Sequence, residues 1–178
     1  RDDKTEYLRT QLLEFNRFAS RHYREVLRHP MRGSAGRQYL KTRQLKDETI
    51  QAFGLGYVPD GWSNLLDAAR EHGFKDGVLE ASGLFKRGDG GRFYDFFRNR
   101  LMFPIEDVSG NVVAFGGRDM GDSPAKYINS PETQVYKKGR TLYGLSKARD
   151  AMRREKCVIL VEGYFDLLRC FDAGVENV

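Results

Sequence analysis

The chain has 178 residues, of which 40% are hydrophobic and 31% are charged, and its formal net charge is +5. This composition excludes an intrinsically disordered chain, and the apolar runs are far shorter than the roughly 20 residues of a membrane-spanning helix. The modest basic excess permits a polyanionic partner but does not identify one. Two cysteines, Cys157 and Cys170, are too few for a disulfide framework, so we expect buried thiols in a reducing compartment such as the cytoplasm.

The first half of the chain is predicted to be mostly helical. Apolar residues recur at helical spacing over residues 5–28, and Pro30 and Gly33 end that helix. The segment "LGYVP" is a candidate for a short strand. Shorter helices are expected over residues 35–42, 47–53, 62–72 and 75–82.

Antiparallel strands are expected from about residue 84 onward. Asp89-Gly90 lies between two aromatic segments and predicts a hairpin, and Ser109-Gly110 predicts a turn between two longer strands. The stretch that follows, to about residue 145, shows little regular pattern. The sequence therefore predicts an α+β fold in which a helical part precedes a mixed subdomain with antiparallel strands.

The last part of the chain has the pattern of a parallel α/β unit. A helix over residues 146–155 precedes an apolar run, 157–161, that is typical of a buried strand. A second helix follows Glu162 and ends at Gly174, and "VENV" predicts the start of another strand. One such unit cannot cover its own sheet, so we expect domains over residues 1–150 and 151–178, the second incomplete. The first residue is also not a methionine, and we expect the chain to be a fragment.

Two acids, Glu162 and Asp166, follow the predicted buried strand directly. Ligands bind at the carboxyl ends of strands in open parallel sheets, and carboxylates there suit Mg²⁺. Acids in the first turn of a helix also cap free N–H groups and stabilise the helix dipole. Spacing alone leaves both interpretations open.

A second group of candidate residues is basic, with tyrosine, asparagine and glycine between the cations. Such a mixture suits a groove that holds phosphates and stacks bases, although a solvated surface would have the same composition. No Cys/His quartet and no Ser-His-Asp arrangement is present, so a structural zinc and a serine hydrolase are not expected. The members of this group are Arg98, Arg100, Arg118, Lys126, Tyr127, Asn129, Lys137, Lys138 and Arg140.

Two stretches resemble the central RNA polymerase domain of bacterial DnaG-type DNA primases. The first runs from "FRNRLMFPIEDVSG" through "AKYINSPET" to "LYGL", and the second, "VILVEGYFD", is similar to the opening motif of a Toprim domain. The segment "YLKTRQLKDETIQAFGLGYVP" matches more loosely. This resemblance implies RNA primer synthesis on single-stranded DNA during replication, by nucleotidyl transfer from ribonucleoside triphosphates.

The resemblance also implies roles for individual residues. Glu162 would be the acid of the Toprim motif, acting as metal ligand or general acid/base, and Asp166 would support it. Nucleotide and template would contact Arg43, Arg98, Arg100, Arg118, Lys126, Tyr127, Asn129 and Lys138.

Other parts of the family's pattern are not found in this sequence. We expect Mg²⁺ or Mn²⁺ in the complete enzyme, with most of its ligands beyond Val178, and zinc only in an N-terminal domain that is absent here. A C-terminal domain that contacts the replicative helicase is absent as well. The alternatives are a fragment of a Toprim nuclease or topoisomerase, or a non-catalytic module that binds single-stranded DNA.

Overall fold

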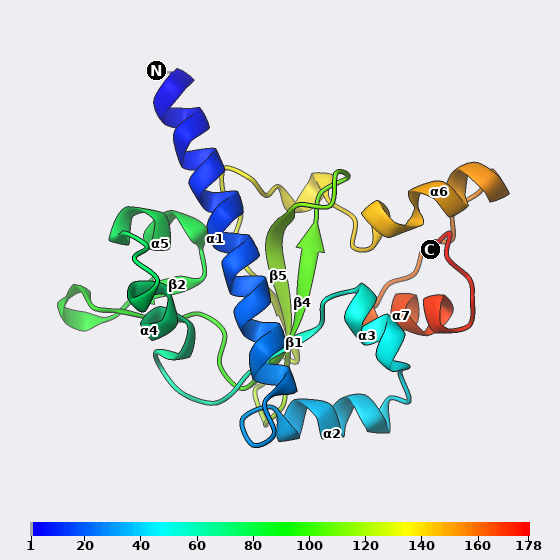
Figure 1. The fold of residues 1–178 in the computed structure, drawn as a ribbon, viewed down its shortest axis with the longest axis horizontal. Coiled ribbons are helices and arrows are strands. Elements are labelled where there is room, and N and C mark those ends of the chain that lie inside the picture. The colour runs from blue at the N-terminus through cyan, green and yellow to red at the C-terminus, as the bar shows by residue number, and fades with distance from the viewer. Residues whose placement is uncertain (1) are drawn as a thin grey trace.

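The computed structural model describes residues 2–178 as an α+β fold built around one antiparallel sheet (Figure 1). The helices are α1 (Asp2–Arg28), α2 (Ser34–Thr42), α3 (Asp47–Ala52), α4 (Asn64–Glu71), α5 (Asp76–Ser82), α6 (Leu145–Glu155) and α7 (Tyr164–Asp172). The strands are β1 (Gly56–Val58), β2 (Phe85–Arg87), β3 (Phe93–Asp95), β4 (Arg100–Glu106), β5 (Val112–Asp119) and β6 (Tyr127–Asn129). Short 3-10 turns occur at Asp89–Gly91 and Lys138–Arg140.

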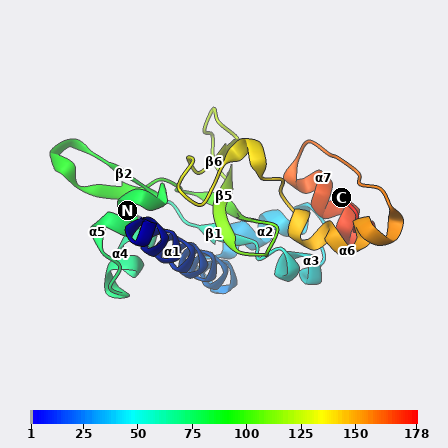
Figure 2. The same cartoon turned by 90° about the horizontal axis from the view of Figure 1, so that it is seen from above.

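The main sheet has the strand order β1-β4-β5-β6, and every neighbouring pair is antiparallel. Strands β2 and β3 form a separate hairpin. Helices α4 and α5 and this hairpin lie on one side of α1 and the sheet, whereas α3, α6 and α7 lie on the other (Figures 1 and 2). The long helix α1 therefore spans the junction between two groups of elements.

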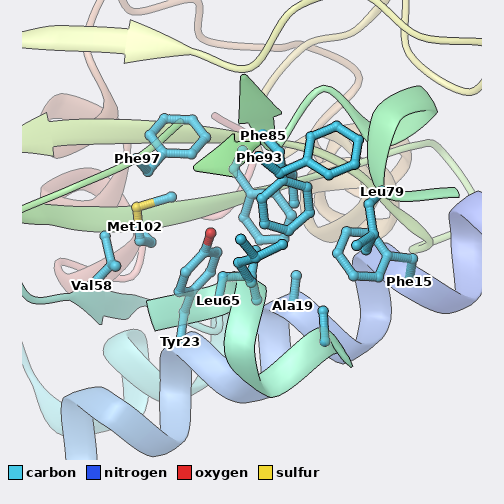
Figure 3. Packing of buried hydrophobic residues seen from close by; sticks show 14 residues of the cluster. Phe15, Ala19, Tyr23, Val58, Leu65, Leu79, Phe85, Phe93, Phe97 and Met102 are labelled. Atoms are coloured by element: carbon cyan, nitrogen blue, oxygen red, sulfur yellow. The ribbon is translucent and has the colours of Figure 1, made fainter. Parts of the chain in front are cut away.

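One hydrophobic core lies between α1, α4, α5 and the sheet (Figure 3). Phe15, Ala19 and Tyr23 project from the apolar stripe of α1, and the Tyr23 ring meets the Phe115 ring of β5 edge to face at 5.4 Å. Helix α1 can approach β1 closely because Gly56 has no side chain: a Cβ there would lie 2.5 Å from the Cβ of Tyr23. The periodic stripe read from the sequence is thus the surface that covers the sheet.

Strand β4 is buried along its length, with only its last residue partly exposed. Its continuous apolar run suits a strand covered on both faces. Pro104 cannot donate a backbone hydrogen bond, and it lies beyond the three β4 residues that pair with β1. The proline is therefore tolerated in a central strand.

A second core joins the end of the chain to its helical beginning. Phe165 and Leu168 of α7 are buried with Leu40 of α2, Val26 of α1 and Phe103 of β4. Helix α6 is held to β4 by Lys147, whose Nζ lies 2.9 and 3.0 Å from the carboxylate oxygens of Glu106. Residues 164–168 thus share a core with elements that are distant in sequence.

Most of the predicted elements are confirmed. The predicted helices in residues 5–82 and over 146–155 form with small shifts at their ends, and "LGYVP" contains β1. Both predicted turns join antiparallel strands: Asp89-Gly90 lies between β2 and β3, and Ser109-Gly110 lies between β4 and β5. The short strand β6 falls in the stretch for which no structure was predicted.

The predicted buried strand over residues 157–161 is wrong. This segment forms no strand, and Val158, Ile159 and Leu160 are 53%, 42% and 78% exposed. A strand needs neighbours on its edges, and the segment has one backbone hydrogen bond to "VENV", from Ile159 N to Asn177 O at 2.8 Å. The segment "VENV" is not a strand either, and the predicted burial of Cys157 is wrong because this thiol is exposed.

Across residues 2–178, no helix has the combined length and apolar character needed to cross a membrane.

Candidate nucleic-acid interface

Two arginines that were predicted to contact nucleic acid, Arg43 and Arg118, both lie against the ring of Tyr39 in α2. The Arg118 guanidinium lies 4.1 Å from the centroid of the Tyr39 ring, and the Arg43 guanidinium lies 5.6 Å from the same centroid. Arg43 also lies 4.4 Å from the ring of Phe165, which meets Tyr39 edge to face. Cations over aromatic faces keep their charge and lose little rotamer freedom, so both arginines are held ready for an anionic partner.

A second tyrosine, Tyr164 at the start of α7, connects α7 to the sheet. Its ring stacks on Phe103 at 4.5 Å and on Tyr127 at 6.1 Å, and its hydroxyl donates a 2.8 Å hydrogen bond to Asn129 Oδ1. The ring fits because β5 has a glycine below it: a Cβ on Gly116 would lie 2.3 Å from the Tyr164 hydroxyl. Tyr164 therefore fixes the positions of Tyr127 and Asn129 relative to α7.

Burial raises the pKa of the Tyr164 hydroxyl, which is protonated at neutral pH. Removal of the hydroxyl from water raises the pKa of Tyr164 far above its ordinary value, although the hydrogen bond with Asn129 acts in the opposite direction. A protonated hydroxyl is a permanent donor, so the Asn129 carbonyl oxygen is occupied. The Asn129 side chain also hydrogen-bonds Tyr136, so it is held between two tyrosine hydroxyls.

A cavity of about 320 Å³ opens where α6, α7 and β6 approach one another. Lys138 and Asn129 line it together with Glu162, Gly163 and Tyr164. A cation and an acid therefore face the same space. This is the place where the predicted basic group and the predicted acidic group meet.

Polar contacts hold α7 against the turn between α2 and α3. Arg169 donates to the backbone carbonyls of Arg43 and Gln44 at 3.1 and 3.2 Å. Asp172 accepts from the Lys46 backbone N–H at 3.1 Å and from the Thr49 hydroxyl. These contacts set the position of Glu162 at the opposite end of the helix.

The two acids have different environments. Asp166 accepts a 3.1 Å hydrogen bond from the Gly163 backbone N–H and so caps α7, as one of the two interpretations of the sequence predicted. Glu162 is exposed, and no hydrogen bond or ion pair of its side chain occurs within residues 2–178. One free carboxylate fits Mg²⁺ as a single ligand, but the described residues contain no cluster of three potential metal ligands.

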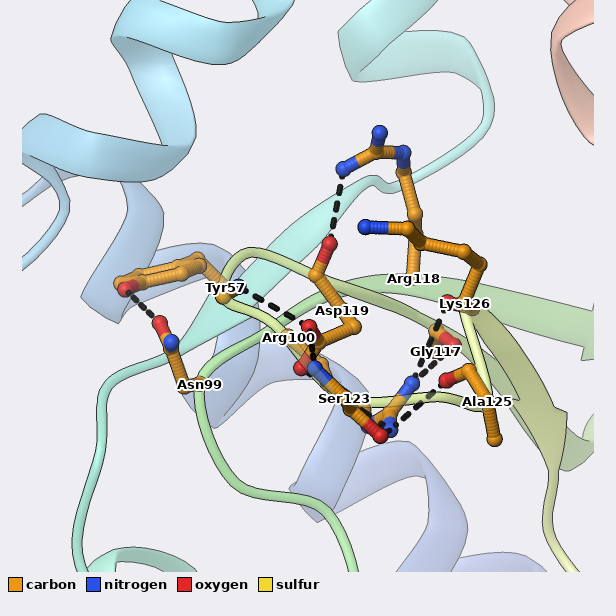
Figure 4. Close-up of polar contacts among 10 residues, drawn as sticks. Tyr57, Asn99, Arg100, Gly117, Arg118, Asp119, Ser123, Ala125 and Lys126 are labelled. Atoms are coloured by element: carbon orange, nitrogen blue, oxygen red, sulfur yellow. Dashed lines mark hydrogen bonds and ion pairs between the residues drawn. The ribbon is translucent and has the colours of Figure 1, made fainter.

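Arg100 requires a correction, because its guanidinium faces the protein (Figure 4). It is buried and donates to the carbonyls of Gly117, Lys126 and Ala125 at 3.1 to 3.2 Å, with Asp119 Oδ1 at 3.9 Å. Burial lowers the pKa of Arg100, and Asp119 acts in the opposite direction. Direct contact with nucleic acid is not available to this side chain, which instead fixes the loop that carries Lys126.

The remaining predicted residues lie at the surface. Lys126 is exposed, and Figure 4 shows it beside Arg118. The Arg98 guanidinium lies 3.7 Å from the ring centroid of Trp62. We call Arg43, Arg118, Lys126, Tyr127, Asn129 and Lys138 the basic face.

Three aromatic residues that organise the basic face were not predicted from the sequence: Tyr39, Tyr164 and Phe165. Tyr164 and Phe165 belong to "EGYFD", and their spacing in the sequence predicts only a helix. A signal was available in the paired glycines of β5, because Gly116 and Gly117 leave room for rings from elsewhere in the chain.

Comparison with known proteins gives a family match over most of the chain and relatives that cover about nine tenths of it. The family described as "DNA primase catalytic core, N-terminal domain" matches residues 22–149. A DNA primase of Deinococcus radiodurans is 46% identical over 164 residues, which is 92% of this chain and 28% of that protein. A DNA primase of Pseudomonas putida is 45% identical over 161 residues, covering 89% of this chain and 24% of that protein. The chain thus spans about a quarter of the length of these relatives.

Solved structures show the same fold. The DnaG primase catalytic domain bound to ssDNA superimposes with a TM-score of 0.87 at 37% identity, covering 97% of this chain and 53% of that one. The RNA polymerase domain of Mycobacterium tuberculosis primase DnaG, in complex with a double-stranded DNA oligomer that has a 6-nucleotide overhang, gives a TM-score of 0.88 at 35% identity. It covers 94% of this chain and 53% of that chain. The α+β class predicted from the sequence is confirmed.

Proposed function

Because the chain belongs to the family of the N-terminal domain of the DNA primase catalytic core, we propose that it forms the template-binding part of an enzyme that synthesises RNA primers. The reaction is attack of a 3′-hydroxyl on the α-phosphate of a ribonucleoside triphosphate, with pyrophosphate as the leaving group. A single-stranded DNA template selects the nucleotide by base pairing. Within this reaction, the chain positions strand and triphosphate beside Glu162.

One observation supports this proposal most directly: two residues of the basic face, Asn129 and Lys138, line the same cavity as Glu162. Arg43 and Arg118, held over Tyr39, neutralise backbone phosphates without reading sequence. The half-exposed ring of Tyr127 offers a stacking surface to a base. The basic face is therefore suited to binding a DNA strand regardless of its base sequence.

Glu162 supplies one carboxylate to a divalent cation, Mg²⁺ or Mn²⁺, whose other ligands come from outside this chain. Such an ion neutralises charge on the reacting phosphates when it is bound. Asp166 supports the site through the Gly163 backbone, since its carboxylate fixes the residue next to Glu162. We assign Glu162 the direct role and Asp166 the positioning role.

The proposal extends to the protein from which this chain derives. Residues 1–150 form the N-terminal subdomain of its catalytic core, and residues 151–178 begin a Toprim domain. A zinc-binding domain precedes this part of the protein, and a domain that contacts the replicative helicase follows it. The enzyme acts in the bacterial cytoplasm, at the nucleoid.

Fluorescence anisotropy of a labelled single-stranded oligonucleotide tests the proposal. Binding by the chain is expected to weaken with salt, and the log–log slope measures the phosphates contacted at about 0.7 for each contact. Failure to bind at low ionic strength would contradict the proposed role of the basic face.

A further inference from the structure

The only tryptophan of the chain lies outside the basic face and remains largely exposed. The Trp62 side chain is 62% exposed, which is unusual for the largest aromatic residue. The Arg98 guanidinium covers one face of the ring at 3.7 Å, and the Tyr94 ring lies nearly perpendicular to it at 5.4 Å. Despite these two contacts, most of the Trp62 residue remains open to solvent.

The loop that carries Trp62 is held at several points. The Trp62 carbonyl accepts a 2.8 Å hydrogen bond from Asp95 N, and the Pro59 carbonyl accepts a 3.1 Å bond from Asn99 N. The Asp95 carboxylate in turn accepts from the backbone N–H groups of Leu65 and Leu66, directly after the loop. A ring fixed in this way loses little conformational entropy on binding.

The pairing register places Arg98, and with it Trp62, at the same end of the sheet as Arg118. Arg98 precedes β4 by two residues, and the first residue of β4, Arg100, pairs with Asp119 and donates to the Lys126 carbonyl. The Asn99 carbonyl also accepts a 3.0 Å bond from Met120 N. Arg98 and Trp62 thus lie at the end of the sheet that carries Arg118 and Lys126.

We propose that Trp62 is a stacking platform for one base of the single-stranded template, at the point where the strand leaves the basic face. The base stacks on the exposed part of the indole, and Arg98, which covers one face of the ring, supplies positive charge for the adjoining phosphate. Stacking of this kind tolerates any base, as template binding requires. The inference rests on the proposed function and adds a contact that this function alone does not assign.

Trp62 reports its own occupancy, because all tryptophan emission of the chain comes from this residue. Oligodeoxythymidine is titrated into the 178-residue chain while tryptophan emission and the anisotropy of a labelled strand are both followed. We expect quenching that follows the binding isotherm. A strand of the same length without bases is expected to bind through its phosphates and to leave the emission unchanged.

Variants separate stacking from charge. Trp62→Ala is expected to lower the affinity by about 5- to 100-fold, whereas Trp62→Phe, which keeps an aromatic face, stays within a few-fold of the parent. Tyr7→Ala is the matched control, because Tyr7 is 68% exposed and lies near the N-terminus, at the far end of α1 (Figure 1). This control is expected to change neither affinity nor quenching.

The outcomes distinguish this inference from the function on which it rests. Strand binding with unchanged Trp62 emission, and with unaltered affinity in Trp62→Ala, would overturn the stacking platform and leave the basic face intact. An absence of strand binding in the anisotropy measurement would overturn both.

Discussion

Lys126 and Lys138 are exposed cations at separate points of the basic face, one beside Arg118 and one at the cavity that Glu162 lines. If each contacts a phosphate, then Lys126→Glu or Lys138→Glu weakens single-strand binding and makes the log–log salt slope less steep by about 0.7 for each lost contact. Anisotropy titrations at several salt concentrations measure both quantities.

Lys4 provides the matched control for these lysines. It is exposed near the N-terminus and lies on no part of the basic face. The Lys4→Glu variant has the same net charge as the other two, so its salt slope shows the effect of total charge alone. Equal slopes in the three variants would assign Lys126 and Lys138 to the solvated surface.

Asp95 has a different role, because it is a buried carboxylate that caps α4. Burial raises the pKa of Asp95 to about 6, although hydrogen bonds from the Leu65 and Leu66 backbone N–H groups act in the opposite direction. An unfolded aspartate has a pKa of about 3.9. Between these values the folded chain binds more protons than the unfolded chain, so acidification favours folding at this site.

The free energy of unfolding is therefore expected to contain a contribution from Asp95 that is complete below about pH 4 and is lost as the pH rises through about 6. Its size is on the order of 2–3 kcal/mol. Urea denaturation of the parent and of Asp95→Asn between pH 4 and 7 measures this contribution. Since asparagine does not titrate, the stability difference in favour of the parent should grow as the pH falls, and a constant difference would contradict the raised pKa.

At the scale of elements, the docking of α7 on the sheet depends on one missing side chain. The Tyr164 ring stacks on Phe103 and lies over Gly116, where a Cβ would approach the hydroxyl to 2.3 Å. Gly116→Ala is expected to displace this ring, to break its bond with Asn129 and to destabilise the fold by about 1–3 kcal/mol. Chemical denaturation measures the loss of stability, and anisotropy measures the accompanying loss of strand binding.

Gly77 in α5 is the matched control for Gly116. A Cβ at Gly77 would have no atom within 4 Å, and alanine favours helix over glycine by up to about 1 kcal/mol. Gly77→Ala should therefore leave stability unchanged or raise it. A Gly116→Ala variant with the same stability and affinity as Gly77→Ala would show that the position of Tyr164 does not depend on this contact.

The elements differ in how far their sequence predicts them. Helix α1 and the turn at Ser109-Gly110 follow from local rules, because apolar spacing and glycine both act over a few residues. The prediction of a strand over residues 157–161 is wrong. Apolar residues show that a segment is suited to a buried strand, but they do not show whether a partner strand lies beside it. Arg100 illustrates the same limit at one residue, because its carbonyl acceptors come from β5 and the following loop.

At the scale of the whole molecule, the chain combines the basic face with one exposed carboxylate, Glu162, at the cavity that Lys138 also lines. The residues of the basic face come from the C-terminal end of α2, from β5, from β6 and the residue before it, and from the turn at Lys138–Arg140. By contrast, the residues 2–178 contain no complete set of metal ligands. We therefore expect strand binding by this chain alone, and primer synthesis only when the chain is part of the longer protein.

Glu162→Gln in the complete primase tests this division of roles. The amide keeps the size of the side chain and removes its charge, so primer synthesis from ribonucleoside triphosphates should fall by about two orders of magnitude or more. Strand binding should persist, because no residue of the basic face is altered. Glu176→Gln makes the same chemical change at another exposed glutamate, 3.7 Å from Arg154, and should leave synthesis unaffected. Full synthesis by Glu162→Gln would show that the Glu162 carboxylate takes no part in the reaction and only lines the cavity.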